Sequence, residues 1–186
     1  GTYTIEDGRV KFQPEPQFTG TATGVEVQRE DTNGTPVKAK YTPTVTAVEP
    51  AAKPADSAGV QGETQKGTPT FTAGNAEVPI KENSVKLLNP DGTEANGPVD
   101  ALDPSGKKVG EYTVDPTTGV VTFTPTDKSY TGQVQPAKVQ AEDKNGSKVS
   151  TTYTPTIVGV TPTATPATTE DVQGKTQESP VSFEGG

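Results

Sequence analysis

The chain carries the same stretch of sequence twice. NGTPVKAKYTPTVTAVEP at 33–50 returns as NGSKVSTTYTPTIVGVTP at 145–162. Aligned without a gap at a constant offset of 112, residues 18–74 and 130–186 share 25 identities in 57 positions. The identities fall on Gly, Pro, Tyr, Phe, Val and turn residues, which are the positions that hold a fold. The chain is therefore a tandem repeat, and any structure must be one that can be built again every 112 residues.

Composition limits what each repeat can be. Only 28% of the 186 residues are hydrophobic, and 20 Gly and 18 Pro interrupt any long helix. Thr, Val, Tyr and Phe occur in short runs between Gly/Pro/Asn/Asp clusters, which is typical of many short strands. A largely disordered, mucin-like stalk is the alternative, because low hydrophobicity also favours disorder.

The second half of a complete unit shows the clearest strand pattern. GEYTV at 110–114 and VVTFTP at 120–125 alternate apolar and polar residues around the turn DPTTG, which predicts a hairpin. AKVQAED at 137–143 and SKVSTTYTPTI at 147–157 alternate as well, and the Asn-Gly turn between them predicts a second hairpin. Before these, TPTFTA, VPI and SVKLL are expected to be short strands.

The fold class expected from this pattern is all-β. Tandem antiparallel β-sandwiches, immunoglobulin-like in outline, would be joined by Pro-rich extended linkers. The expected core is thin and consists of Phe71, Ile80, Val85, Leu87, Leu102, Val109, Tyr112, Val114, Phe123, Tyr130, Val139, Val149 and Tyr153.

The repeat is out of phase with the ends of the sequence, so the chain looks like part of a longer protein. The expected division is the C-terminal part of one repeat, a Pro-rich linker, a complete repeat, a second linker and the start of the next repeat: 1–48, 49–58, 59–160, 161–171 and 172–186. Proline at matching places favours extended, stiff linkers. In the alternative phasing the boundary lies at GTYT and GEYT, and the Pro-rich segment lies inside a domain.

Charge and missing residue types exclude several functions. The chain has no Cys or His, so the usual zinc sites and every His-based triad are excluded. A net charge of −8 argues against nucleic acid and acidic membrane surfaces as partners. No apolar run approaches the length of a membrane span.

A few motifs could carry chemistry. The acidic loops EDTNG at 30–34 and EDKNG at 142–146, and NPDGTEANG at 89–97, have oxygen ligands at a spacing compatible with Ca²⁺, but the same letters describe hairpin turns. Lys86 and Lys138 are candidates for an isopeptide bond to Asn. The recurrent YTPT at 41–44 and 153–156 is expected to end the last strand, with Pro halting the ladder.

No enzyme activity is expected. Asp and Glu are plentiful, but they lie in turns and linkers, and no aromatic-rich cleft is evident that could hold a substrate such as a sugar. We expect no catalytic residue, no cofactor site and no metal site.

The order and spacing of three motifs resemble one family. VQGETQKGTPTFTAG, GEYTVDPTTGVVTFTP and EDKNGSKVSTTYTPTI are similar to the repeat unit of CshA-type fibrillar adhesins of streptococci. The resemblance covers essentially the whole chain. It implies an extracellular, cell-wall-anchored fibril whose repeats hold an adhesive region away from the surface. The family's adhesive region, which recognises host fibronectin, has no counterpart among these residues.

Three functions remain in play. The first is a structural stalk whose partners are the neighbouring repeats of the same chain. The second is a repeat that binds a host matrix or salivary glycoprotein weakly and gains avidity from many copies. The third is self-association between fibrils.

Overall fold

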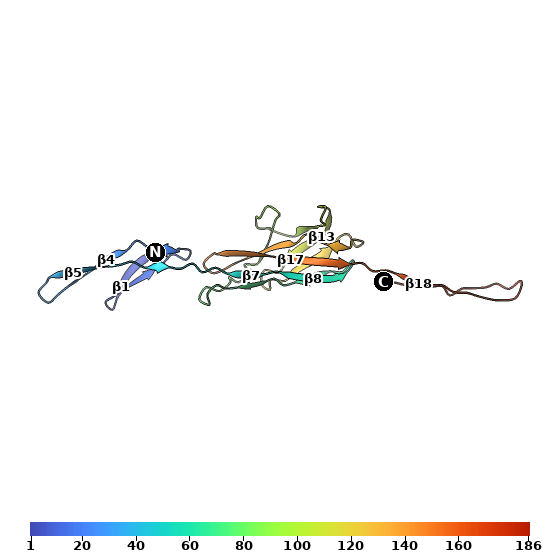
Figure 1. The fold of residues 1–186 in the computed structure, drawn as a ribbon, viewed down its shortest axis with the longest axis horizontal. Helices are drawn as coiled ribbons and strands as arrows, with labels where there is room; N and C mark the ends of the chain where they lie inside the picture. Colours follow the sequence, from blue (N-terminus) through green and yellow to red (C-terminus); the bar gives the residue numbers. More distant parts are fainter.

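The computed structural model describes all residues 1–186 and shows an elongated molecule made only of strands and loops. Three parts follow one another along the long axis: an N-terminal part, a central domain and a C-terminal hairpin (Figure 1). The expected all-β class is confirmed. No element is a helix long and apolar enough to cross a lipid bilayer.

Two sheets form the central domain. In one sheet, β9 (Gln65–Gly67) and β12 (Val99–Leu102) flank the hairpin of β13 (Lys108–Val114) and β14 (Val121–Pro125). The other is built on β17, and its strands are β8 (Ala55–Val60), β11 (Lys86–Leu88), β15 (Gly132–Gln133), β16 (Ala137–Glu142) and β17 (Lys148–Val158). Both predicted hairpins are present, with Tyr112 opposite Phe123 and Ala137 opposite Tyr153.

The core lies between the two sheets, as a sandwich requires. Tyr112 from one sheet meets Tyr153 from the other, with ring centroids 6.1 Å apart at 79°. Most of the expected core residues lie in the buried cluster or pack against it, whereas Leu102 and Val149 are only partly buried and lie outside it. The pattern missed several buried residues, among them Ala101, Val121, Val134, Ala137, Ala141 and Ile157.

The N-terminal part repeats half of this fold. β1 (Thr2–Glu6) and β2 (Arg9–Gln13) pair as β13 and β14 do, with Tyr3 opposite Phe12. The remaining N-terminal strands are β3 (Gly20–Thr21), β4 (Val25–Glu30), β5 (Pro36–Tyr41) and β6 (Thr44–Val45). Their pairings, such as Val25 with Tyr41, match those of β15, β16 and β17 at the offset of 112.

The C-terminal hairpin repeats the start of the fold. β18 (Thr163–Thr165) pairs with β19 (Ser182–Glu184), as β7 (Ala51–Lys53) pairs with β10 (Thr70–Thr72). Ala164 lies opposite Phe183 in one pair, and Ala52 lies opposite Phe71 in the other. The sequence repeat is therefore also a repeat of strand pairing.

The Pro-rich segment 49–58 differs from the expected linker. Residues 51–53 form β7, and Ala55–Val60 forms β8, which pairs with Tyr153–Val158 of β17. The backbone groups of this extended segment are thus satisfied within a sheet. Segment 161–171 likewise contains a strand, β18. The pairing of β8 with β17 is parallel, an exception to the expected antiparallel sandwich.

The YTPT motif of the central domain does not end its strand. β17 continues through Pro155 to Val158, and Pro155 is buried. Its carbonyl accepts a hydrogen bond from the Val134 N–H (3.4 Å), so the strand keeps a partner on that edge. Proline is tolerated here because this position lies at the break between β15 and β16, where the ladder is already interrupted.

Candidate functional site

The best-defined polar site is a buried network between β8, β9 and β17. Ser57 Oγ donates to Gln65 Oε1 (2.6 Å) and lies 2.7 Å from Tyr153 Oη. Gln65 Nε2 donates to the Thr156 carbonyl (3.1 Å). Gln65 is 6% exposed and Tyr153 is fully buried, so water is largely excluded from these bonds. Burial raises the pKa of the Tyr153 phenol, partly offset by its hydrogen bond with Ser57.

Half of this network recurs in the next copy. Thr169 and Gln177 occupy the places of Ser57 and Gln65 at the offset of 112, and Thr169 Oγ1 lies 2.5 Å from Gln177 Oε1. The counterpart of Tyr153 among these residues is Tyr41, which lies in the preceding copy. No sequence pattern in the Ser57, Gln65 and Tyr153 segments predicted this network. The available signal was that the last Gln of VQGETQ, Gln65, is identical in VQGKTQ, as Gln177. An exposed loop would not require Gln at that position.

Close packing supports the same site. A Cβ placed on Gly67 would lie 2.3 Å from Cε2 of Tyr153, so only glycine leaves room for the ring. Beyond the network, the Gln61 N–H donates to the Val158 carbonyl (2.9 Å), and the Val160 N–H donates to Gln61 Oε1 (3.1 Å). The chain that leaves β17 is therefore held to the end of β8.

The acidic loop 142–146 uses its aspartate to hold a turn. Asp143 Oδ1 accepts hydrogen bonds from the backbone N–H groups of Asn145 (2.9 Å) and Ser147 (2.8 Å). Asp31 in the loop 30–34 does the same with Asn33 and Thr35. This Asx-type bonding is ordinary turn chemistry. Asp143 Oδ2 is buried and has no hydrogen-bond partner.

The loop 89–97 holds an ion cluster. The Glu94 carboxylate accepts hydrogen bonds from Lys86 (2.5 Å) and Lys148 (2.7 Å). These bonds lower the Glu94 pKa to about 2, and the bond from Lys148 has the largest effect. Asp91 caps the turn through the Thr93 hydroxyl and N–H, which lower its pKa. No three Asp or Glu side chains anywhere in the chain gather closely enough to hold a metal ion.

Both isopeptide candidates have solvent-exposed side chains. Lys86 is half exposed and paired with Glu94, and Lys138 is exposed on β16. No hydrogen bond joins either lysine to an asparagine. Lys86 lines the same hollow as Asn83 and Asn96, but its ammonium group is paired with Glu94.

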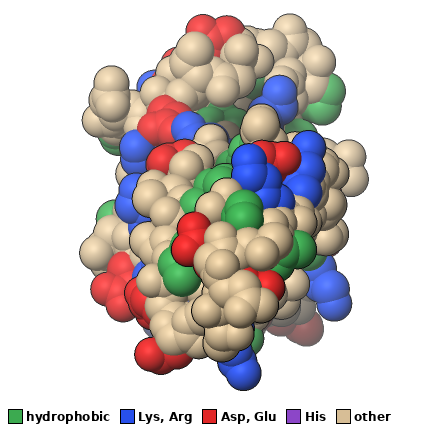
Figure 2. Space-filling view, turned by 90° about the vertical axis from the view of Figure 1, so that its left-hand side faces the viewer, with side chains coloured by type: hydrophobic (Ala, Val, Ile, Leu, Met, Phe, Trp, Pro, Cys, Tyr) green, Lys and Arg blue, Asp and Glu red, His purple; other side chains and the backbone are tan.

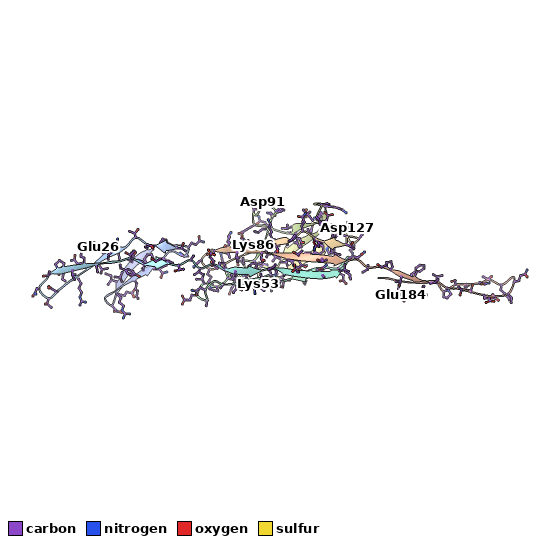
Figure 3. The ribbon with its side chains drawn as sticks, in the orientation of Figure 1. Glu26, Lys53, Lys86, Asp91, Asp127 and Glu184 are labelled. Carbon is purple, nitrogen blue, oxygen red and sulfur yellow. The ribbon has the colours of Figure 1, made fainter.

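No cleft assembles charged groups for chemistry. A hollow of ≈ 480 Å³ beside β11 and β13 contains a single charged side chain, Lys86, and no carboxylate. Labelled charged residues from all three parts, from Glu26 to Glu184, are spread along the molecule rather than converging (Figure 3). From the N-terminal end, hydrophobic side chains form small separate areas between polar atoms and charges of both signs (Figure 2).

Comparison with solved structures adds little. The fibronectin(III)-like modules of CbhA from Clostridium thermocellum match with a TM-score of 0.33 and 15% identity over 76% of this chain and 64% of theirs. The N-terminal eight immunoglobulin domains of Down Syndrome Cell Adhesion Molecule match with a TM-score of 0.38 and 13% identity over 97% of this chain. The chain spans only 27% of that second protein. At these scores the likeness is weak, and the fold is defined by its own strand pairing.

Comparison of sequences is decisive for the family. No curated protein matches significantly. A family model described as the surface adhesin CshA repetitive domain matches residues 1–45 and 47–157, which is most of the chain. The resemblance noted in the sequence is thereby confirmed, and so is the expectation that the protein is not an enzyme. The chain belongs to the family of surface adhesin CshA repetitive domains.

Proposed function

We propose that this repeat is a structural stalk unit of a wall-anchored fibrillar adhesin, holding an adhesive region away from the bacterial cell. The observation that carries the proposal is the end-to-end order of the three parts along one axis, with the same strand pairs recurring at the offset of 112. Each added repeat then extends the molecule in the same way, as expected for a quasi-one-dimensional array.

The surface supports a spacer better than a binding module. Binding hot spots are enriched in large aromatic and Arg side chains gathered in a desolvated patch. In the central domain Tyr112, Phe123 and Tyr153 are buried between the sheets, and Phe71 and Tyr130 are partly buried against the same core. The net charge of −8 keeps neighbouring fibrils apart in solution.

The domain division stays part of the proposal, with a changed boundary. We place the start of each repeat before the Pro-rich segment, at about residue 47–50, because β7 and β8 pair only with strands that follow them. The complete repeat then ends near Val160, and a short connection leads to β18. The partners proposed for each repeat are its neighbours, and host glycoproteins such as fibronectin would bind elsewhere in the parent protein.

Surface capture tests the proposal. The 186-residue chain and a tandem version with several complete repeats are passed over immobilised fibronectin and salivary glycoproteins. A stalk gives flat traces at high concentration for both. Saturable binding that strengthens with copy number would refute the stalk and establish the adhesive alternative, since avidity grows with linked copies. Association of the tandem version with itself would support contacts between fibrils instead.

A further inference from the structure

The strands next to the two ends of the central domain lie side by side. The chain comes into the domain through β7 and β8 and leaves it through β17. β8 and β17 pair in parallel over six residue pairs, from Ala55 with Tyr153 to Val60 with Val158. Both run along the long axis of the molecule, which is also the direction in which the neighbouring parts lie (Figure 1).

This geometry decides how the pair responds to tension. Pulling on the two ends of the chain draws β8 towards the N-terminus and β17 towards the C-terminus. Because the strands are parallel, these two displacements are opposite and run along the strands. The hydrogen bonds lie across that direction, so all six residue pairs are loaded together. An antiparallel hairpin pulled from its two open ends would instead lose its bonds one after another.

β17 is also held by the strands on its other edge. On its other edge β17 pairs with β16 over six residue pairs and with β15 over two. β7 precedes β8 and holds only three pairs with β10, so we expect it to detach first under tension. Load then reaches β8, the last strand before the buried core is exposed.

Side chains reinforce this pair at its centre. Ser57 on β8 is bonded both to Tyr153 on β17 and to Gln65, whose amide donates to the Thr156 carbonyl of β17. Sliding β8 along β17 breaks both bonds of Ser57 at the same time as the backbone bonds, while the Gln65–Thr156 bond holds Gln65 against β17. Gln65 and Tyr153 are buried while Ser57 is partly buried, and a buried polar group that loses its partner is costly.

We propose that the β8–β17 pair, pinned by Ser57, Gln65 and Tyr153, is a load-bearing clamp that lets each repeat carry tension along the fibril without unfolding. The inference adds a mechanical function to the proposed stalk and rests on that proposal for its physiological setting. The Thr169–Gln177 bond repeats the Ser57–Gln65 part of the pin in the following copy.

Single-molecule force spectroscopy on the full chain tests the clamp. The chain lacks cysteine, so introduced cysteines define the pulling points uniquely. With handles at the two ends we expect high unfolding forces. With handles at Thr118→Cys and Asn145→Cys, the tips of one hairpin from each sheet, the sheets part without sliding β8 on β17, and the force should be markedly lower. Equal forces in the two geometries would overturn the proposal.

Two variants test the pin itself. Gln65→Ala removes the bonds to Ser57 and Thr156 and should raise the unfolding rate under end-to-end load roughly tenfold or more. Ser57→Ala serves if Gln65→Ala fails to fold. The control is Val121→Ala, a fully buried position in the other sheet, which lowers equilibrium stability but should change the unfolding force less.

The outcomes separate the clamp from the stalk. A Gln65→Ala protein that is folded by circular dichroism yet unfolds at the wild-type force would refute the pin. A force loss from Val121→Ala as large as that from Gln65→Ala would show that the force reports general stability rather than the clamp. Neither result would contradict the stalk proposal. That proposal is refuted only if the repeats capture a host protein.

Discussion

Phe123 offers the sharpest test of the core between the two sheets. Its side chain is fully buried, its ring lies 5.7 Å from that of Tyr112, and Gly110 packs against it so closely that a Cβ there would be 2.4 Å from Cε2. Phe12 has the equivalent place in the N-terminal part, opposite Tyr3, but it is only partly buried. The two substitutions Phe123→Ala and Phe12→Ala therefore change the same position of the repeat in two settings.

The expected cost follows from burial. A buried Phe replaced by Ala loses about 3–5 kcal/mol, from lost apolar transfer and the remaining cavity. A domain of this size has about 5–15 kcal/mol in total, so Phe123→Ala removes a large share. With a urea m-value of about 2 kcal/mol/M, the midpoint of the central domain's transition should fall by roughly 2 M. Phe12→Ala lies outside the central core and should change that transition by less than about 0.5 kcal/mol.

Urea denaturation followed by circular dichroism measures both variants in the 186-residue chain. A loss below about 1 kcal/mol for Phe123→Ala would contradict a sandwich packed around this ring. An equal loss from Phe12→Ala would mean that the N-terminal part and the central domain unfold as one cooperative block.

Three further outcomes are expected. The Glu94 pKa is lowered from 4.5 to about 2 in the folded state. Ionised Glu94 therefore contributes to stability above pH 4.5, and this contribution is lost as the pH falls towards 2. Glu94→Gln should flatten the pH dependence of Tm between these two values. Burial raises the Tyr112 pKa above its usual 10, so its contribution to stability is lost as the pH rises through the alkaline range above 10. Alkaline unfolding followed by circular dichroism should show a cooperative step above pH 10, and loss of strand structure already complete at pH 10 would contradict this. Gly119 has φ of +73° in the turn after β13, so Gly119→Ala should lower the free energy of unfolding by about 1 kcal/mol in denaturation experiments. The matched control is Gly97→Ala, which should be nearly neutral because Gly97 has open space around it and no positive φ.

Local patterns predicted the parts of the fold that are themselves local. The hairpins at 110–125 and 137–157 follow from period-2 alternation and from turns that the sequence identifies, and the structure contains both. Tyr112, Val114, Phe123, Val139 and Tyr153 of those strands were placed in the core correctly. Val149 was placed there wrongly, and Val121 and Ile157 were missed. Ala101, Ala137 and Ala141 were missed because Ala contributes little to a hydrophobic pattern, although each is nearly or fully buried.

The β8 strand could not be found in the same way. ADSAGV follows Pro54 and contains small and polar residues, so it has the composition of an extended linker. Its partner lies far along the chain, since Ser57 and Tyr153 are 96 residues apart. What makes it a strand is the edge that β17 leaves open, and that edge exists only after the rest of the sheet has assembled.

The same separation of β8 from β17 has a consequence for synthesis and export. A chain made from its N-terminus presents β8 long before the strand that completes it, so a repeat cannot close until nearly all of its length is available. The matching strand of the preceding repeat, Thr44–Val45, is already present and only a few residues away. A parallel pair in one sheet needs a crossover of about a dozen residues or more. The segment 46–54 is therefore too short to let β8 pair in parallel with Thr44–Val45. Each repeat can complete its sheet only with its own last strand, not with the matching strand of the preceding repeat.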